Sequence, residues 1–195
     1  MKKIILLTVL IIIVLCVCVW IFKNFNLNRN HKPGDIVDNL DGVNVYYNGG
    51  VSHTEGRNLT ADGYNLGIKY QCVEFIKRYY YEHYNHKMPD TYGNAKDFFR
   101  KGIKEMKLND ARGLIQLHNP GGVKPQKGDI VVFSPTIFNR FGHVAIISEV
   151  TDSTIQIVQQ NPGPFGASRE VFPLEHKDNK WKIKNRRIMG SLRMP

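Results

Sequence analysis

Cysteine is scarce in this sequence, and acidic residues are missing from its first 32 positions. Only three cysteines occur in 195 residues, and two of them, Cys16 and Cys18, lie in an uncharged apolar run. The rest of the chain therefore holds one thiol, Cys72, which excludes a disulfide-stabilised scaffold. Lys and Arg are scattered, with neither an RGG run nor an aromatic-basic RNP pattern, so we expect no nucleic-acid partner.

The apolar run at the amino terminus has the length of a membrane span. Residues 4–22 carry no charge and only Thr8 as an ordinary polar interruption. As a helix this run is roughly 28 Å long, close to the thickness of a bilayer core. A cleaved signal peptide would have a shorter apolar stretch and small residues at its cleavage site, and no Ala-x-Ala follows here. We therefore expect residues 4–22 to be an uncleaved, single-pass anchor in a bacterial cytoplasmic membrane.

Charge around the span gives the expected orientation. Lys2 and Lys3 favour a cytoplasmic amino terminus, although three further basic residues lie close on the other side of the span. We expect the domain to lie on the outer (periplasmic or extracellular) face. Residues 1–32 then form the anchor and a polar spacer, and residues 33–195 form one domain large enough to bury its own core. That domain holds 22 basic and 17 acidic residues, which indicates at most a mild attraction to anionic surfaces.

Hydrophobic periodicity changes along the domain. Helical spacing begins at Cys72 and continues to His83, and a second helix is expected from Asn94 to Lys107. Segments 48–67 and 113–127 are rich in turn residues and are predicted to be loops. Strand candidates follow at 130–133, 143–150, 154–160, 180–183 and 187–194. Helices first and adjacent strands afterwards predict an α+β fold with a mostly antiparallel sheet.

Cys72 and His143 are the residues most suited to catalysis. Cys72 stands at the predicted start of a helix, where unpaired N–H groups and the helix dipole stabilise a thiolate. The alternative is that Cys72 is a small buried hydrophobic residue, and its position alone leaves the two interpretations even. His143 opens an apolar strand, and a thiolate nucleophile needs a base of this kind.

Four ordered blocks around these two residues resemble a known family. They are residues 67–75 (GIKYQCVEF), 127–133 (KGDIVVF), 142–147 (GHVAII) and 158–161 (VQQN). The blocks are similar to the CHAP domain, a papain-like group of cysteine, histidine-dependent amidohydrolases and peptidases. Within that family the chain most resembles the amidase domain of bacterial glutathionylspermidine synthetase/amidase, over roughly residues 33–195. The resemblance implies a papain-like fold, with N-terminal helices packed on the sheet.

The resemblance also implies roles for individual residues. Cys72 would be the nucleophile and His143 the general base, then acid, of a mechanism that passes through a thioester. The backbone N–H of Cys72 is the natural oxyanion donor, and Gln71 is either a second donor or a loop-packing residue. In the relatives a Glu stands where this chain has Gln159, so Gln159 can orient the histidine but cannot neutralise its charge. Asn161, on the same face of a strand as Gln159, is the other candidate for orienting the ring.

These features predict a membrane-anchored cysteine amidase or peptidase. We expect its substrate to be an amide bond in peptidoglycan peptides, with a glutathionylspermidine-type amide as the alternative. A catalytically weak module that binds the cell wall is a further alternative, motivated by Gln159. No cofactor is expected. No metal is expected either, because the loop before Cys72 offers Asp62 but no Asp-x-Asp series.

Overall fold

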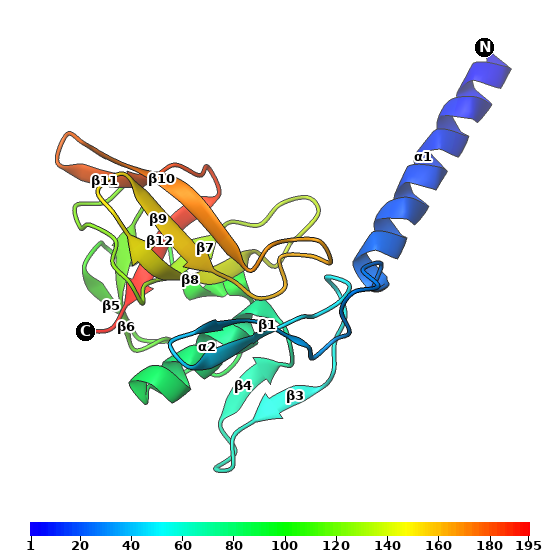
Figure 1. The fold of residues 1–195 in the computed structure, drawn as a ribbon. Coiled ribbons are helices and arrows are strands. Elements are labelled where there is room, and N and C mark those ends of the chain that lie inside the picture. Colours follow the sequence, from blue (N-terminus) through cyan, green and yellow to red (C-terminus); the bar gives the residue numbers. More distant parts are fainter.

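The computed structural model describes residues 1–195 (Figure 1). It contains a long amino-terminal helix, a second α-helix, one short 3-10 helix and twelve strands. Their order along the chain is α1 (Lys2–Asn24), β1 (Ile36–Leu40), β2 (Val43–Tyr46), β3 (Arg57–Leu59), β4 (Asn65–Ile68), α2 (Cys72–Tyr84), η1 (Ala95–Phe98), β5 (Lys107–Asn109), β6 (Leu114–His118), β7 (Ile130–Phe133), β8 (His143–Val150), β9 (Thr154–Val158), β10 (Arg169–Lys177), β11 (Lys180–Ile183) and β12 (Ile188–Arg193).

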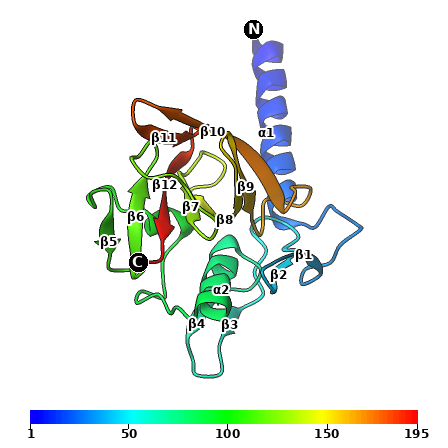
Figure 2. The ribbon, with the colours of Figure 1, turned by 60° about the vertical axis from the view of Figure 1, so that its left-hand side comes forward.

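One eight-stranded sheet dominates the domain. Its strand order is β11-β10-β9-β8-β7-β12-β6-β5, and every strand pair is antiparallel. Two small hairpin sheets, β1-β2 and β3-β4, flank α2 (Figure 2). The α+β class and the mostly antiparallel sheet predicted from the sequence are confirmed.

The continuous apolar runs of β7 and β8 arise because both faces of these strands are buried. Ile130 and Val132 of β7 belong to the core cluster that α2 covers, whereas Val131 and Phe133 belong to a second core cluster. The second cluster consists of residues from strands of the same sheet, which therefore curves around it. Since successive side chains of a strand point to opposite faces, a strand buried on both faces needs apolar residues throughout.

The helix predicted at Cys72 is confirmed, but the helix predicted from Asn94 to Lys107 is wrong. Only η1 forms in that segment, closed by a reciprocal capping box between Asn94 and Asp97. The buried side chain of Gln116 then takes the place of helical hydrogen bonding. It accepts from the Arg100 N–H at 2.9 Å, donates to the Arg100 carbonyl at 2.9 Å and donates to the Ile103 carbonyl at 3.3 Å. A tertiary contact here overrides a helical hydrophobic pattern.

Two segments predicted to be loops also contain strands. β3 and all but the last residue of β4 lie within 48–67, and β6 lies within 113–127. These strands are three to five residues long and carry several polar residues, so they lack the alternation that identifies a strand.

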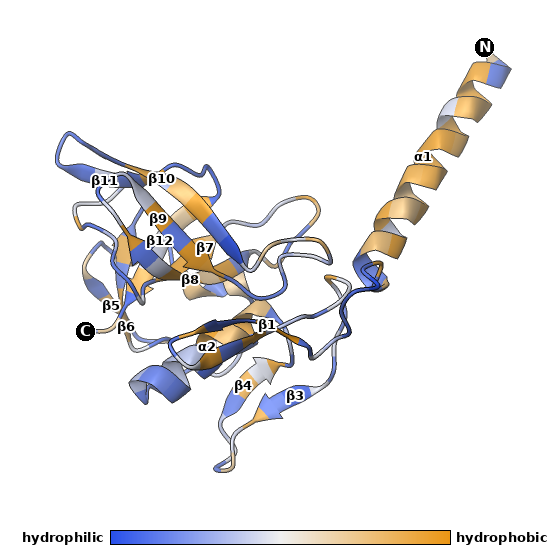
Figure 3. Ribbon diagram, viewed as in Figure 1, coloured by the Kyte–Doolittle hydropathy of each residue, from blue (hydrophilic) through white to orange (hydrophobic).

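Helix α1 projects from the domain, and no residue along it is buried (Figure 1). It is the one helix that is long and apolar enough to cross a membrane by length and composition. In Figure 3 the ribbon of α1 has the colour of hydrophobic residues along almost its whole length, whereas hydrophobic and hydrophilic residues alternate along the ribbon of the domain.

Candidate active site

Cys72 is the first residue of α2, and the backbone before it is shaped to bring it there. Gln71 is the extended N-cap residue, and Tyr70 has a positive φ of 66°. Gly67 in β4 has a φ of 128°, and a Cβ at this position would lie 3.2 Å from the Glu74 Cα. A glycine is therefore required for β4 to pass this close to the first turn of α2.

A buried polar network fixes the start of α2 against the end of β9. Glu74 is 1% exposed and accepts hydrogen bonds from Arg78 Nε at 2.7 Å, Asn58 Nδ2 at 2.8 Å and Gln160 Nε2 at 2.8 Å. Gln160 Nε2 also donates to the Gln71 carbonyl at 3.0 Å. Because a buried carboxylate without partners is costly, these contacts hold the segments that carry Cys72 and Gln159 in one relative position.

The surroundings of Cys72 keep its thiol protonated. Burial raises the pKa of Cys72 to about 11, and hydrogen bonds from the backbone N–H groups of Val144, Val73 and Cys72 itself offset only part of that rise. The raised pKa favours a neutral thiol over the thiolate expected at the helix start, because desolvation outweighs the helix terminus. The contact with the Val144 N–H also places the Cys72 sulfur against β8, beside the residue next in the chain to His143.

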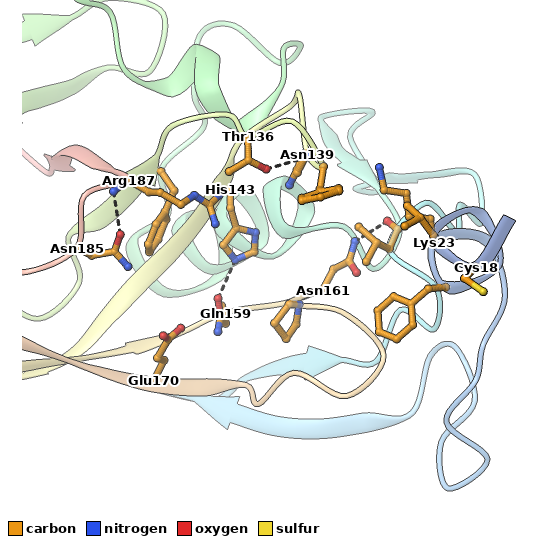
Figure 4. Close-up of a pocket in the computed structure, with 16 residues that line it drawn as sticks. Cys18, Lys23, Thr136, Asn139, His143, Gln159, Asn161, Glu170, Asn185 and Arg187 are labelled. Carbon is orange, nitrogen blue, oxygen red and sulfur yellow. Dashed lines mark hydrogen bonds between the residues drawn. The ribbon is translucent and has the colours of Figure 1, made fainter. Parts of the chain in front are cut away.

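His143 is oriented by Gln159. Its Nε2 lies 2.9 Å from Gln159 Oε1, and Gln159 Nε2 donates to the Ala167 carbonyl at 3.1 Å (Figure 4). The contact with the Ala167 carbonyl fixes which way the Gln159 amide points, so that its oxygen faces the His143 ring. The Nε2 of His143 must then carry the proton, because that oxygen can only accept a hydrogen bond. The unprotonated nitrogen of the neutral ring is then Nδ1. Burial lowers the pKa of His143 to about 4, the Gln159 contact raises it, and the neighbouring Arg187 lowers it.

Gln71 and Asn161 form a second pair, separate from the ring. Asn161 Nδ2 donates to Gln71 Oε1 at 2.8 Å and to the Val51 carbonyl at 2.9 Å. Gln71 Nε2 donates to the His53 carbonyl at 2.7 Å and, at 3.3 Å, to the Val51 carbonyl. The amide hydrogens of Gln71 are thus occupied by loop carbonyls. Asn161 makes no hydrogen bond to His143, so of the two candidate orienting residues only Gln159 contacts the ring.

Two adjoining cavities meet at His143. One has a volume of about 690 Å³ and the other of about 680 Å³, and both are lined by Lys23, Val51, Phe138, Asn139, His143 and Asn161. Cys72 lines the second cavity. Figure 4 shows His143 in the middle of the first, with Arg187 and Asn185 on one side and Lys23 and Cys18 of α1 on the other.

The charges around the cleft are mostly positive. Lys23, Arg57 and Arg140 line the cavity that contains Cys72, and no Asp or Glu does. In the other cavity Glu170 is the single acid, beside Lys23 and Arg187. No group of three or more His, Cys, Asp or Glu side chains is placed to hold a metal ion. That no metal is needed stays a prediction.

Sequence reasoning missed the residues that support the site. Glu74, Gln160 and Arg187 are not among the site residues predicted from the sequence. The spacing of Glu74 and Arg78, four residues apart on a helix, was the available signal for their ion pair. Nothing in the sequence marks the contacts of Gln160, because its partners are distant along the chain.

A family model and several known proteins are similar to this chain. The family model described as "CHAP domain" matches residues 61–161, just over half of the chain. The chain belongs to the CHAP domain family. The match spans Cys72, His143 and Gln159, and membership supports hydrolysis of an amide bond.

Two curated proteins from Crithidia fasciculata are similar to parts of the chain. The trypanothione synthetase is 30% identical over 131 residues, which is 66% of this chain and 20% of that protein. The glutathionylspermidine synthase is 33% identical over 101 residues, which is 50% of this chain and 14% of that protein. The chain therefore spans a fifth or less of the curated relatives that it matches.

Two solved structures also align with the chain. The crystal structure of the wild-type endolysin LysIME-EF1 aligns with a TM-score of 0.40 and 18% identity, covering 74% of this chain and 61% of that one. The crystal structure of Ly7917 aligns with a TM-score of 0.40 and 14% identity, covering 64% of this chain and 53% of that one.

Proposed function

We propose that this protein is a membrane-anchored cysteine amidase that cleaves an amide bond in peptidoglycan peptides. Cys72 is the nucleophile, His143 the base and then the acid, and Gln159 the residue that orients the ring. One observation carries this assignment. The Cys72 sulfur lies against the backbone of β8 next to His143, and the tautomer of His143 is fixed by Gln159 within the same cleft.

The pKa values favour a neutral resting pair. With a thiol pKa of about 11 and an imidazole pKa of about 4, neither group is charged near neutral pH. His143 Nδ1 takes the thiol proton as the sulfur attacks the amide carbon. The same proton then passes to the leaving amine as the C–N bond breaks and the thioester remains. Water, deprotonated by His143, attacks the thioester carbon and releases the carboxylic acid and the free thiol.

The start of α2 would stabilise the oxyanion that forms when the sulfur attacks the amide carbon. The Cys72 backbone N–H stands at a helix terminus, where such groups lack helical partners and favour a negative charge. Gln71 is assigned a positioning role, because its amide already binds the carbonyls of Val51 and His53 and the amide of Asn161. Asn161 holds Gln71, and through it the residue that precedes the nucleophile.

The charge of the cleft favours an anionic peptide. Three cations and no acid line the cavity that contains Cys72. Peptidoglycan stem peptides carry carboxylates, which these cations attract, whereas spermidine is a polycation, which they repel. The same argument favours the outer face of the cytoplasmic membrane, where such peptides occur, with α1 as the anchor.

A second candidate is a glutathionylspermidine-type amidase. It is favoured by the similarity to the trypanothione synthetase and the glutathionylspermidine synthase. A catalytically weak wall-binding module is the remaining alternative, because Gln159 cannot neutralise an imidazolium. The fixed tautomer of His143 argues against that alternative.

One experiment separates the three. The purified full chain is incubated with peptidoglycan fragments and, in parallel, with glutathionylspermidine, and new amines are identified by mass spectrometry, with a Cys72→Ala variant as the control. We expect new amines from the peptidoglycan fragments only, and none with the variant. Cleavage of glutathionylspermidine alone would favour the second candidate, and no cleavage of either would favour the binding module.

A further inference from the structure

The end of α1 forms part of the wall of the active-site cleft. Cys18, Val19, Phe22 and Lys23 line the cavity that also contains His143 and Gln159. The contact is specific, because the Lys23 carbonyl accepts a hydrogen bond from the Ser52 N–H at 2.9 Å. A Cβ at Gly50 would lie 2.7 Å from the same carbonyl, so a residue without a side chain is needed where the loop meets the helix.

Two loops beside this end of α1 carry exposed apolar side chains. The loop between β7 and β8 presents Ile137, which is 90% exposed, together with Phe138 and Phe141, which are 62% and 50% exposed. The loop between β9 and β10 presents Phe165, which is 63% exposed. We call these four residues the apolar rim. Ile137 is the most exposed large apolar residue beyond α1, in residues 25–195.

The apolar rim is continuous with the apolar surface of α1. The rings of Phe165 and Phe22 lie 6.1 Å apart, and Phe138 lines both cavities together with Lys23 of α1. Figures 1 and 2 show both loops beside the lower end of α1 in two views. Exposed apolar patches of this kind mark interaction sites rather than ordinary surface.

Cations accompany the rim in the arrangement that a membrane surface favours. Arg140 lies over the Phe141 ring, with its guanidinium carbon 5.0 Å from the ring centroid, and Lys23 lies in the last turn of α1. Aromatic side chains settle at the boundary between headgroups and acyl chains, while Lys and Arg reach the phosphates.

We propose that the apolar rim docks into the headgroup boundary of the bilayer that α1 crosses, so that the cleft opens at the membrane surface. This proposal rests on the proposed anchoring of α1. The substrate is then a peptide held at the membrane, such as one linked to a lipid, rather than a peptide free in solution. The bilayer is the occupant that fits, because the rim continues an apolar helix and carries cations that complement anionic lipids.

The test places a fluorescent label on the rim in the full-length chain. Phe138→Cys is made in a background in which Cys16, Cys18 and Cys72 are replaced by Ser, and is labelled with a polarity-sensitive dye. Leu108→Cys on β5 is the matched control, since Leu108 is 49% exposed and lies in the strand at the far edge of the large sheet. Both proteins are reconstituted in nanodiscs of phosphatidylethanolamine and phosphatidylglycerol that contain nitroxide-labelled lipid.

We expect the dye at position 138 to be quenched severalfold more strongly than the dye at position 108, with emission shifted to the blue. Equal, weak quenching at both positions overturns the proposal, and so does a shift at 138 that appears only when two chains share a nanodisc. This readout needs no turnover, so it decides docking even if the proposed activity fails.

A second measurement tests the consequence for the substrate. The same stem peptide is offered with and without a fatty-acyl chain, and the ratio of kcat/KM values is compared between the wild type and Ile137→Ser/Phe165→Ser. We expect the wild type to favour the acylated peptide by about tenfold and the variant to lose most of that ratio. An unchanged ratio contradicts membrane delivery, whereas no cleavage of either peptide contradicts the proposed function instead.

Discussion

The interior and the rim of the cleft are built in opposite ways. In the interior, Glu74, Gln159 and Gln160 are buried, and each is held by two or more hydrogen bonds. At the rim, apolar side chains face solvent on loops. A buried polar group loses free energy if it leaves its partners, so the interior keeps one geometry. The rim has no such restraint and suits a deformable partner such as a lipid surface, so the proposed catalytic interior and the proposed docking rim are separate parts of the cleft.

The largest effect on stability is expected from removing the centre of the interior network. Glu74→Ala leaves the buried guanidinium of Arg78 without its carboxylate and removes one hydrogen-bond acceptor of Gln160, so the free energy of unfolding should fall by about 3–5 kcal/mol. Urea denaturation measures it. The control is Glu170→Ala, which removes an exposed carboxylate that makes no ion pair. A loss for Glu74→Ala no larger than that of the control would mean that the network does not hold the site.

Loss of the base should lower activity strongly while leaving the fold intact. His143→Gln removes the proton acceptor, and turnover should fall by about 10²–10⁴-fold. The control is His118→Gln, because His118 is partly buried and hydrogen-bonded to the Ile103 carbonyl at 2.9 Å but lines neither cavity. Comparable losses in the two variants would contradict the role of His143.

Gln159→Glu tests how a charge in the interior of the cleft affects turnover, because it adds a charge without adding bulk. A carboxylate would stabilise the imidazolium that forms during turnover, and we expect turnover to rise by about tenfold. The structure adds a cost in stability. Gln159 Nε2 now donates to the Ala167 carbonyl at 3.1 Å, and in the variant a carboxylate oxygen would face that carbonyl instead. Loss of this hydrogen bond should lower the free energy of unfolding by about 1 kcal/mol. Gln159→Ala should instead lower turnover. If neither variant alters turnover while Asn161→Ala abolishes it, Asn161 is the orienting residue.

The neutral resting pair predicts how alkylation depends on pH. With the pKa of Cys72 at about 11, the rate of iodoacetamide modification should rise about tenfold per pH unit from about pH 6 to about pH 10. The modified peptide that contains Cys72 is quantified by mass spectrometry. A rate that is flat above about pH 5 would reveal a thiolate–imidazolium pair and contradict the neutral one.

The lowered pKa of His143 also predicts that the folded chain becomes less stable as the pH falls. Its ordinary pKa of 6.5 is lowered to about 4 in the folded chain, so the unfolded chain binds a proton first as the pH falls between these values. Stability should therefore decline from about pH 6.5 to about pH 4, and the decline should be smaller in His143→Gln. Identical pH dependence in the two proteins would show that His143 is not buried as a neutral ring.

The proposed catalytic residues are easier to select from the sequence than the residues that support them. Cys72 and His143 stand at a helix start and a strand start, and the resemblance to the family adds their roles and that of Gln159, which the structure places against the His143 ring. The helix expected after Asn94 fails because Gln116, from another strand, satisfies its backbone groups. The raised pKa of Cys72 could not be predicted either, because desolvation of the thiol depends on all the residues that pack over it. Both the contacts of Gln116 and the packing over Cys72 come from residues distant in the chain, so the hydrophobic periodicity of the sequence could not reveal them.

The central claim is that Cys72 forms a thioester with the acyl part of a peptide amide. Its most direct test is mass spectrometry of the full chain, quenched in acid during turnover of peptidoglycan-derived peptides. We expect an acyl adduct on the peptide that contains Cys72, and loss of hydrolysis in Cys72→Ala. Hydrolysis that continues undiminished in Cys72→Ala, with no adduct on the wild-type protein, would contradict it.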